Sequence, residues 1–524
     1  MTALAGALRF DSCPSDAFFQ WDGRLDEPAG VDPATVPLRE LIGDWSLVHW
    51  NPAARVLVLA SDFAGTRPLY YRIDGRTVRW SSSLRELAES GETPELDDRY
   101  FAALLAPGMP CGVTPYRGIE AVPPGCAVRI EADRVRVERF WDATVVPDSR
   151  GDYEERLLDV FRTAVESRVR GHARVCCELS GGLDSTSVAC MALRVHPNVT
   201  TFSYTHPGAA DEPYIRAVEQ QYGIAGEHLD VREYPFVTPE RTGGAAPGWW
   251  EPRFRGLAAR MESLGASAFL TGQMGDLAMG NTLDDSEQVA APVRRLRLGE
   301  AAREAFAWSQ SLRIPIYPIL WRAVRLAATS WAPQDDLSPT AWRRVSRENS
   351  FGPRLRNVAP APVAGALDWR AAAPDRRRRV RGLAGWVEAR RLQAPEPLQH
   401  VAYSHPFADR RLVEFMLAIP PAEVVRPGEP RRLMRRAFAG FLPEPVLLRK
   451  SKASFGGFYD ECLAPLAQEM LRDPARLRSV ELGYLDRDNL VERLGRYLGG
   501  ADSNAGQLRV AILVEFWLRT ARYR

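Results

Sequence analysis

Short apolar runs with alternating polar positions fill the first 145 or so residues. They include WSLVHW at 45–50, VLVLAS at 56–61, PLYYRI at 68–73 and AVRIEA at 127–132, and the turn-forming stretches NPAA, DGR and PPG separate them. Alternation of this kind places successive side chains on opposite faces of a strand, and the turn residues end each run. The pattern predicts a first domain of stacked antiparallel sheets.

The pattern changes after VVPDSRGD at 145–152, where an amphipathic helix is expected over 153–170. Strand-like and helix-like segments then alternate: RVCCEL, TTFSYT, GEHLDV and SAFLTGQ read as strands, with helical periodicity between them. This alternation predicts a parallel sheet with crossover helices on both faces. We therefore expect an α/β protein with one domain over 1–147 and a second over 148–524.

Beyond about residue 290 the periodicity is mostly helical. Five aromatic residues in this stretch are expected in the core: Trp308, Tyr317, Trp321, Trp331 and Trp342. The arginine run at 376–379 is expected on a solvated loop or helix face, and its functional alternative is an anchor for an acidic partner.

The bulk composition is that of a soluble globular protein with more than one domain. The chain has 524 residues, 45% of them hydrophobic, and a formal net charge of +2. This balance gives no reason to expect a nucleic-acid partner. No apolar stretch reaches membrane-spanning length and the first residues lack a secretory pattern, so neither a membrane partner nor export is expected. We expect a cytoplasmic protein.

The seven cysteines are scattered and include no C-x-x-C pair, which favours reduced thiols over a disulfide framework or a zinc site. Cys176 and Cys177 fall in an expected buried strand and are interpreted as core residues. Lysine is rarer still, because only Lys450 and Lys452 occur among 68 basic residues. Lysine is a recurrent phosphate ligand that arginine does not simply replace, so this pair marks a candidate anion site.

The stretch SGGLDSTS, from Ser180 to Ser187, lies between the strand RVCCEL and a helix expected to begin near Ser185. Free N–H groups at a helix N-terminus bind anions, and adjacent glycines let the backbone approach a phosphate. Asp184 would repel phosphate unless a cation lay between them. The residues therefore predict a phosphate site that holds Mg²⁺.

SGGLDS resembles the signature of the PP-loop ATP pyrophosphatases, which cleave ATP between its α and β phosphates to adenylate a substrate. The resemblance implies that Ser180, Gly181, Gly182, Asp184 and Ser185 hold ATP and Mg²⁺. By position alone, the backbone of Leu179 and the strand end at Ser203 and Tyr204 are candidate adenine contacts.

Two further stretches resemble motifs of asparagine-synthetase-like members of this family. TGQMGDLAMGN at 271–281 resembles the second phosphate motif, with Gly272 at the nucleotide and Asp276 as the second metal carboxylate, although Met274 stands where a small residue is usual. LLRKSKASF at 447–455 resembles the late lysine segment. This likeness implies that Lys452 is catalytic and that Lys450 binds the nucleotide.

The first domain resembles the Ntn-type glutaminase domain of asparagine synthetases in LIGDWSLVHWNPAARVLVLASDFAGTRPLYY at 41–71, WSSSLREL and YRGIEAVPPGC. HPFADRRLVEF at 405–415 extends the resemblance into the second domain. Such a glutaminase uses an N-terminal cysteine whose α-amine serves as its base. Residue 2 is Thr2 and the first cysteine is Cys13, so we expect an inactive domain and an amine supplied by the substrate.

Relatives that have made this change close rings, as β-lactam synthetases and lasso peptide macrolactam synthetases do. Residues 291–345 resemble the lasso cyclases more than the small-ring enzymes, and Glu388 falls near the glutamate that the small-ring enzymes use with a tyrosine. The expected partners are a precursor core peptide as substrate, a leader peptidase and a leader-recognition protein. A β-lactam synthetase, an asparagine synthetase and a non-enzymatic peptide scaffold remain as alternatives.

Overall fold

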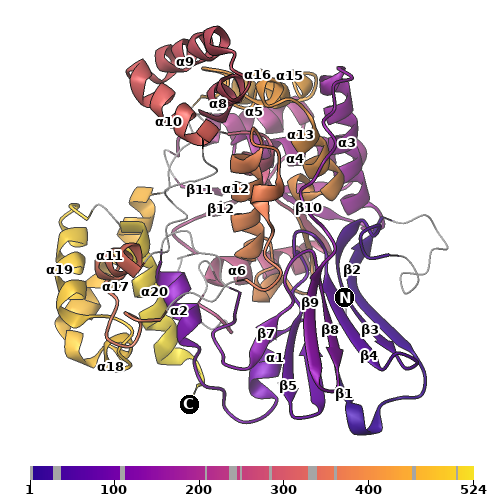
Figure 1. The fold of residues 1–524 in the computed structure, drawn as a ribbon, viewed down its shortest axis with the longest axis vertical. Coiled ribbons are helices and arrows are strands. Elements are labelled where there is room, and N and C mark those ends of the chain that lie inside the picture. The colour runs from indigo at the N-terminus through magenta and orange to yellow at the C-terminus, as the bar shows by residue number, and fades with distance from the viewer. Residues whose placement is uncertain are drawn as a thin grey trace.

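The computed structural model describes residues 4–26, 37–106, 112–206, 209–234, 245–247, 251–281, 286–328, 339–358, 363–450, 456–502 and 505–523. Two antiparallel sheets form the N-terminal part of the molecule, and a parallel sheet flanked by helices follows (Figure 1). This arrangement confirms the expected α/β architecture. Among the described residues, no helix is both long and apolar enough to cross a membrane.

The N-terminal sheets have the strand orders β1-β6-β5-β7 and β2-β3-β4-β8-β9. Their strands are β1 (Ala5–Arg9), β2 (Phe18–Leu25), β3 (Gly43–Asn51), β4 (Val56–Ser61), β5 (Tyr70–Asp74), β6 (Thr77–Ser81), β7 (Ile119–Ala121), β8 (Cys126–Glu131) and β9 (Arg134–Arg139). The alternation along β3 works as predicted, because Val48 and Trp50 enter the core that both sheets share while Trp45 and Leu47 pack on the outer face. The short helices of this part are η1 (Phe10–Ser12), α1 (Leu84–Glu89) and α2 (Asp98–Leu105).

The third sheet is parallel throughout, with the order β12-β11-β10-β13-β14. Its strands are β10 (Val175–Glu178), β11 (Val199–Thr205), β12 (Glu227–Asp230), β13 (Ala268–Leu270) and β14 (Ala402–Ser404). The helices between them are α3 (Tyr153–Val169), which precedes β10, α4 (Leu183–Val195), α5 (Glu212–Tyr222) and α6 (Glu251–Leu264). Cys176 and Cys177 are fully buried in the central strand β10, as predicted.

Helical segments surround this sheet. The first group is α7 (Gly275–Ala278), α8 (Ser286–Arg294), α9 (Leu298–Leu312), α10 (Ile316–Ala328), α11 (Pro339–Glu348), η3 (Trp369–Ala371), α12 (Arg377–Glu388) and η4 (Glu396–Leu398). The second is η5 (Pro406–Ala408), α13 (Arg410–Ala418), α14 (Pro421–Val424), α15 (Arg432–Ala437), α16 (Glu444–Leu448), α17 (Gly456–Arg472), η6 (Pro474–Arg476), α18 (Arg478–Glu481), α19 (Arg487–Leu498) and α20 (Ala505–Thr520). Helix α2 packs against α20, so an early and a late segment share one core (Figure 1).

Two sequence expectations about side-chain burial are wrong. Trp308 is buried as predicted, but Tyr317 and Trp321 are 70% and 65% exposed; Trp331 lies outside the described residues. The arginine run is not solvated throughout, because Arg376 is buried and donates hydrogen bonds to the carbonyls of Leu417 and Ala418. Those carbonyls end α13, where a helix lacks internal donors and favours positive charge.

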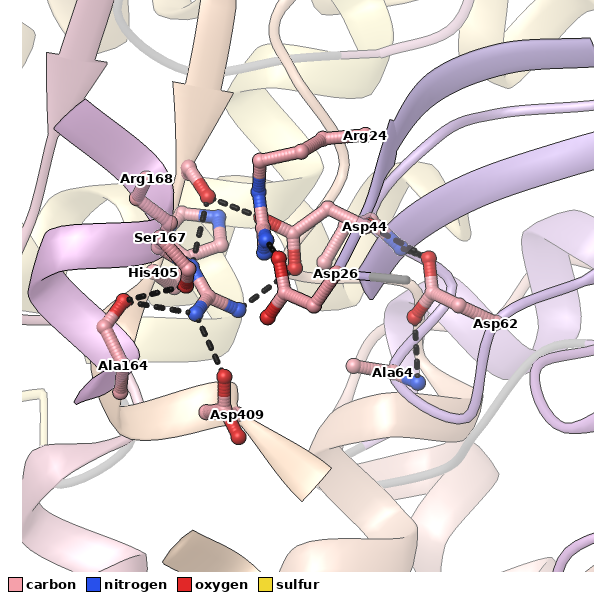
Figure 2. A network of polar contacts seen from close by, with 12 residues as sticks. Arg24, Asp26, Asp44, Asp62, Ala64, Ala164, Ser167, Arg168, His405 and Asp409 are labelled. Carbon is pink, nitrogen blue, oxygen red and sulfur yellow. Dashed lines mark hydrogen bonds and ion pairs between the residues drawn. The ribbon is translucent and has the colours of Figure 1, made fainter. Parts of the chain in front are cut away.

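A buried ion network joins the N-terminal sheets to the parallel sheet (Figure 2). Arg168 of α3 pairs with Asp44 of β3 at 2.6 Å and with Asp409 at 2.7 Å, and its own side chain is 1% exposed. Its Nε donates to Ser404 Oγ at 2.9 Å, and that hydroxyl donates to Asp44. Burial alone would raise the pKa of Asp44, but the charges of Arg168 and Arg24 lower it well below its usual range.

The same network reaches the loop that follows β13. His405, next to Ser404, is fully buried between the carbonyl of Leu392 and the hydroxyl of Thr271, 2.8 and 2.7 Å away. A carbonyl only accepts, so Nε2 carries the proton and Nδ1 accepts from Thr271. Burial lowers the pKa of His405 to about 4, which keeps the ring neutral. The Thr271 hydroxyl in turn accepts the N–H of Gln273 and thereby fixes the turn after β13.

Replacing Arg168 with methionine is expected to destabilise the fold strongly. The variant leaves Asp44 and Asp409 buried without their main cation, which costs on the order of 3–5 kcal/mol. Arg216, which is exposed and paired with Glu212 and Glu219, provides the matched control, and its methionine variant should lose under about 1 kcal/mol. Denaturant unfolding measures both, and equal losses in the two variants would contradict this role for Arg168.

Candidate active site

The candidate site is a cavity of about 390 Å³ beyond the carboxyl ends of β10 and β13. Ligands of open parallel sheets bind at such strand ends, where loops lead into helices. The lining residues are Glu178, Ser180, Gly182, Leu183, Asp184, Ser185, Gly272, Gln273, Met274, Asp276, Leu277, Asn281, Trp386, Arg431, Arg435, Arg449 and Lys450. Predicted residues from three distant stretches of the sequence therefore meet in one cavity.

The first loop, Ser180–Gly182, turns directly from β10 into α4. Gly181 has a φ of +69°, a left-handed conformation that favours glycine, and Gly182 is the N-cap of α4. The Ser185 hydroxyl accepts the N–H of Ser180 at 3.1 Å and lies 2.8 Å from the Ser180 hydroxyl. The free N–H groups at the start of α4 thus border the cavity together with two hydroxyls, as an anion site requires.

The second loop, Gly272–Gly275, packs directly against the first. A Cβ at Gly272 would lie 2.2 Å from the Ser185 nitrogen, and a Cβ at Gly275 would lie 2.4 Å from the Asp184 carboxylate. Only glycine allows this approach at either position. Between them, Met274 adopts a φ of +74°, an uncommon conformation for a side chain of this size, and is buried. The loop therefore accommodates the unusual methionine by burying it.

Asp184 and Asp276 face the same cation. The guanidinium of Arg431 donates to both carboxylates, with Nη2 2.8 Å from Asp184 Oδ2 and a closer contact to Asp276. Arg431 is buried and Asp184 nearly so, whereas the Asp276 side chain is about half exposed. Two carboxylates that come from different strand ends thus converge on one positive charge.

This pair of carboxylates fits the Mg²⁺ that the sequence predicts. Magnesium in proteins is commonly bound by one or two carboxylates, and substrate phosphates and water complete its octahedral shell. In the described part of the chain, no group of three or more His, Cys, Asp or Glu side chains is placed to hold a metal ion. Asp184 and Asp276 would therefore hold the ion only together with ligands from a bound nucleotide.

Three further cations line the same cavity. Arg449 donates to the Gly181 carbonyl at 3.0 Å and pairs with Asp211. Arg435 donates to the Arg449 carbonyl at 2.9 Å, and burial, together with the nearby charge of Arg431, lowers its pKa. Lys450 also lines the cavity, as predicted for a nucleotide contact. Lys452 lies outside the described residues.

The proposed adenine contacts do not line this cavity. Leu179 and Ser203 are buried in the sheet, where the Ser203 hydroxyl donates to the Leu179 carbonyl at 2.7 Å. Tyr204 lies under the guanidinium of Arg253, 4.7 Å from its ring centre. The end of β10 contributes Glu178 to the cavity instead. Position at a strand end alone does not show that the pairing of neighbouring strands uses Leu179 and Ser203 internally.

Glu388 is likewise not among the residues that line the cavity. It is buried at the end of α12, where its carboxylate accepts the N–H of Leu367 at 2.6 Å and burial raises its pKa. Helix α12 presents Trp386 to the cavity, two residues earlier and therefore on another side of the helix. The structure thus assigns Glu388 a structural contact and does not bring it to the predicted metal carboxylates.

Sequence reasoning missed Arg431, Arg435 and Arg449. Each belongs to a chain that uses arginine almost everywhere, so composition did not distinguish them. A local signal does exist, because RRLMRR at 431–436 precedes the two lysines and LLRK at 447–450 includes the first of them. The pairing of Arg431 with Asp184 joins residues 247 positions apart, and only the fold reveals it.

The comparison with protein families identifies the class. The asparagine synthase model matches residues 156–241 and 255–519, which is more than half of the chain, and a glutamine amidotransferase domain model matches residues 34–141. The chain belongs to the asparagine synthase family, whose members are ATP-dependent carbon–nitrogen ligases.

Individual relatives are distant. The chain is 22% identical to the glutamine-hydrolyzing asparagine synthetase 3 of Bacillus subtilis strain 168, over 87% of this chain and 74% of that protein. A putative asparagine synthetase of Mycobacterium bovis is 28% identical, over 37% of this chain and 32% of its own length. A solved allosteric regulatory enzyme of purine biosynthesis is 13% identical over 45% of this chain and 48% of that one, and its TM-score of 0.15 is too low to bear on the fold.

Replacing Gly272 with alanine should abolish tight nucleotide binding without unfolding the protein. The added methyl group would push the second loop away from Ser185, and the two acids would separate. We expect the affinity for Mg²⁺-ATP, measured by calorimetry, to fall at least about tenfold, the equivalent of about 1.4 kcal/mol. Gly385 of α12 has open space around its Cβ position, so its alanine variant is the control and should bind normally. Unchanged binding by the Gly272 variant would contradict the close-contact argument.

Proposed function

We propose that this protein is an ATP-dependent macrolactam synthetase that joins an Asp or Glu side chain of a peptide to the α-amine of the same peptide. The observation that carries the proposal is the convergence of Asp184 and Asp276 on the guanidinium of Arg431, beside a glycine loop at a helix N-terminus. Phosphate, a divalent cation and a carboxylate substrate can be brought together there. The reaction releases AMP and pyrophosphate.

The activation step is the adenylation of the substrate carboxylate. A carboxylate oxygen attacks the α-phosphorus, the bond from that phosphorus to the β-bridging oxygen breaks, and pyrophosphate leaves. The backbone N–H groups at the start of α4 and the hydroxyls of Ser180 and Ser185 would hold the phosphates. Mg²⁺ held by Asp184 and Asp276 would supply positive charge for the nucleotide. Lys450 and Lys452 would stabilise the charge that develops on the leaving groups.

The second step forms the amide. The amine attacks the acyl carbon, the carbon–oxygen bond to AMP breaks, and the amine loses a proton, so the peptide loses one water overall. A peptide α-amine has an ordinary pKa near 8, and a substantial fraction is unprotonated near neutral pH without a strong base. This chemistry therefore does not require Glu388.

The cysteines of the first domain support a substrate-derived amine over ammonia from glutamine. Thiol-dependent glutamine hydrolysis needs a reactive thiolate. Burial raises the pKa of the Cys126 thiol to about 11, and Cys13 packs against the core between the two sheets. Cys126 is fully buried and therefore lacks the accessible surroundings of a nucleophile. Cys111 lies outside the described residues.

The choice of a peptide ring depends on the sequence resemblance of residues 291–345 to lasso cyclases. On this proposal the precursor core peptide is the substrate, and a leader peptidase and a leader-recognition protein act with the enzyme. An asparagine synthetase is the second candidate, because the family and the named relatives favour it. A β-lactam synthetase would use the same adenylation but a much smaller substrate.

Incubation with ATP, Mg²⁺ and three candidate substrates separates these functions. We expect a core peptide to lose 18 Da with one AMP and one pyrophosphate released per ring, while aspartate with glutamine or ammonia and small β-amino acids stay unchanged. Replacement of Lys452 with alanine should slow cyclisation on the order of 10²-fold or more. The alanine variant of Lys450 is its matched comparison. Formation of asparagine without ring closure would contradict the proposal. Incubation with the core peptide that releases no pyrophosphate from ATP would contradict it as well.

A further inference from the structure

Helices α8, α9 and α10 form a helical appendage, residues 286–328, that projects beyond the parallel sheet (Figure 1). The three helices pack against one another around Val289, Ala305, Trp308 and Ile319, and Val425 anchors this small core to the rest of the molecule. The appendage therefore has its own interior and does not need its outer face for stability.

The outer face of the appendage is unusually apolar. Twelve large hydrophobic side chains are exposed in the described part of the chain, and seven of them lie within residues 296–324. These seven are Leu296, Leu298, Phe306, Ile314, Tyr317, Trp321 and Val324. Single exposed hydrophobic residues are ordinary, but a concentration of them marks an interaction site.

Helix α10 is apolar on two opposite sides. Ile319 and Ala323 face the appendage core, whereas Tyr317, Trp321 and Val324 are exposed. The exposed three are spaced four and three residues apart, which places them along one line of the helix surface. A helix with apolar side chains on two opposite sides is normally covered on both, and spacing of four and three is that of a seam along which a second helix packs.

The charge of the appendage specifies the partner further. Residues 286–328 contain seven arginines and three glutamates, an excess of four positive charges, while the whole chain has a net charge of only +2. Five of these arginines are exposed: Arg295, Arg297, Arg303, Arg313 and Arg322. A second copy of this chain would bring the same positive charge to a symmetric contact, which disfavours self-association through this face. A partner with negative charge fits.

We propose that the seam Tyr317–Trp321–Val324 docks an acidic amphipathic helix of a partner protein. Its apolar side chains would cover the seam, and its carboxylates would meet the surrounding arginines. An anionic membrane would match the charge as well, and the vesicle measurement below separates it from a helical partner. Four residues separate the appendage from Asn281, which lines the cavity and donates to Asp276. The appendage is therefore close in sequence to the loop that carries Asp276.

Binding of two designed helical peptides tests this proposal. Both carry leucine at the seam-facing positions of a 21-residue helix, and the remaining positions are mainly glutamate in one and lysine in the other. With labelled peptides and the full-length protein, anisotropy should show that only the glutamate peptide binds, and more weakly at high salt. Tyr317→Ser combined with Trp321→Ser should weaken binding at least about tenfold, since interface aromatics commonly dominate affinity. A second variant, Arg303→Glu with Arg313→Glu, should weaken binding of the glutamate peptide and admit the lysine peptide.

The control is Val146→Ser, which removes an exposed apolar side chain outside the appendage and should leave peptide binding unchanged. Mg²⁺-ATP binding should persist in every variant, so a failure here is distinguishable from a failure of the proposed function. The proposal is overturned if the glutamate peptide does not bind or binds the seam variants equally well. It is also overturned if the protein self-associates in sedimentation and the seam mutations abolish that self-association. Vesicles of phosphatidylcholine and phosphatidylglycerol that displace the peptide, and that the seam variants no longer bind, would overturn it too.

Discussion

The close contact between two backbone loops determines the candidate site. The loops after β10 and β13 touch at Gly272 and Gly275, where any side chain would collide with Ser185 or Asp184. Because parallel strands end at the same edge of a sheet, their loops are neighbours, and glycine closes the remaining space. The result is that Asp184 and Asp276, 92 positions apart in the sequence, share the guanidinium of Arg431.

The first domain supports this geometry from a distance. Asp44 belongs to an antiparallel sheet, yet it pairs with Arg168 of the second domain and accepts a hydrogen bond from Ser404. From Ser404 the contacts continue through His405 to Thr271, at the start of the second loop. A domain that resembles a glutaminase can therefore contribute to the synthetase site through these contacts, whether or not it hydrolyses glutamine.

The exposed seam adds a constraint of another kind. The cavity supplies charge and hydrogen-bond donors for a nucleotide, but closing a peptide ring also requires the peptide to be held in place. The appendage is joined to the loop of Asp276 by a short segment, and its outer face has the apolar and basic character of a docking surface. Catalysis and delivery of the substrate would then use separate surfaces of the protein.

Much of the fold and the phosphate loop could be predicted because their signals are local. Alternating runs indicate strands, and the motif SGGLDS by itself indicates a turn followed by the start of a helix. The role of Arg431 could not be predicted, since it depends on a contact with Asp184, 247 positions away in an arginine-rich chain. The exposure of Tyr317 and Trp321 could not be predicted for a related reason: helical spacing shows that a helix has an apolar side, but not that two sides are apolar and one is uncovered. Glu388 and Ser203 are not among the residues that line the cavity, because counting residues does not show which way a side chain faces.

The most direct measurement follows oxygen from the peptide into the nucleotide. The central claim is that Asp184 and Asp276 organise ATP for attack on its α-phosphorus by a side-chain carboxylate. A core peptide whose acceptor carboxylate carries ¹⁸O in both positions should transfer one labelled oxygen to AMP as its ring closes, and mass spectrometry of the AMP measures the transfer. Unlabelled AMP, or label in inorganic phosphate together with ADP, would contradict the account.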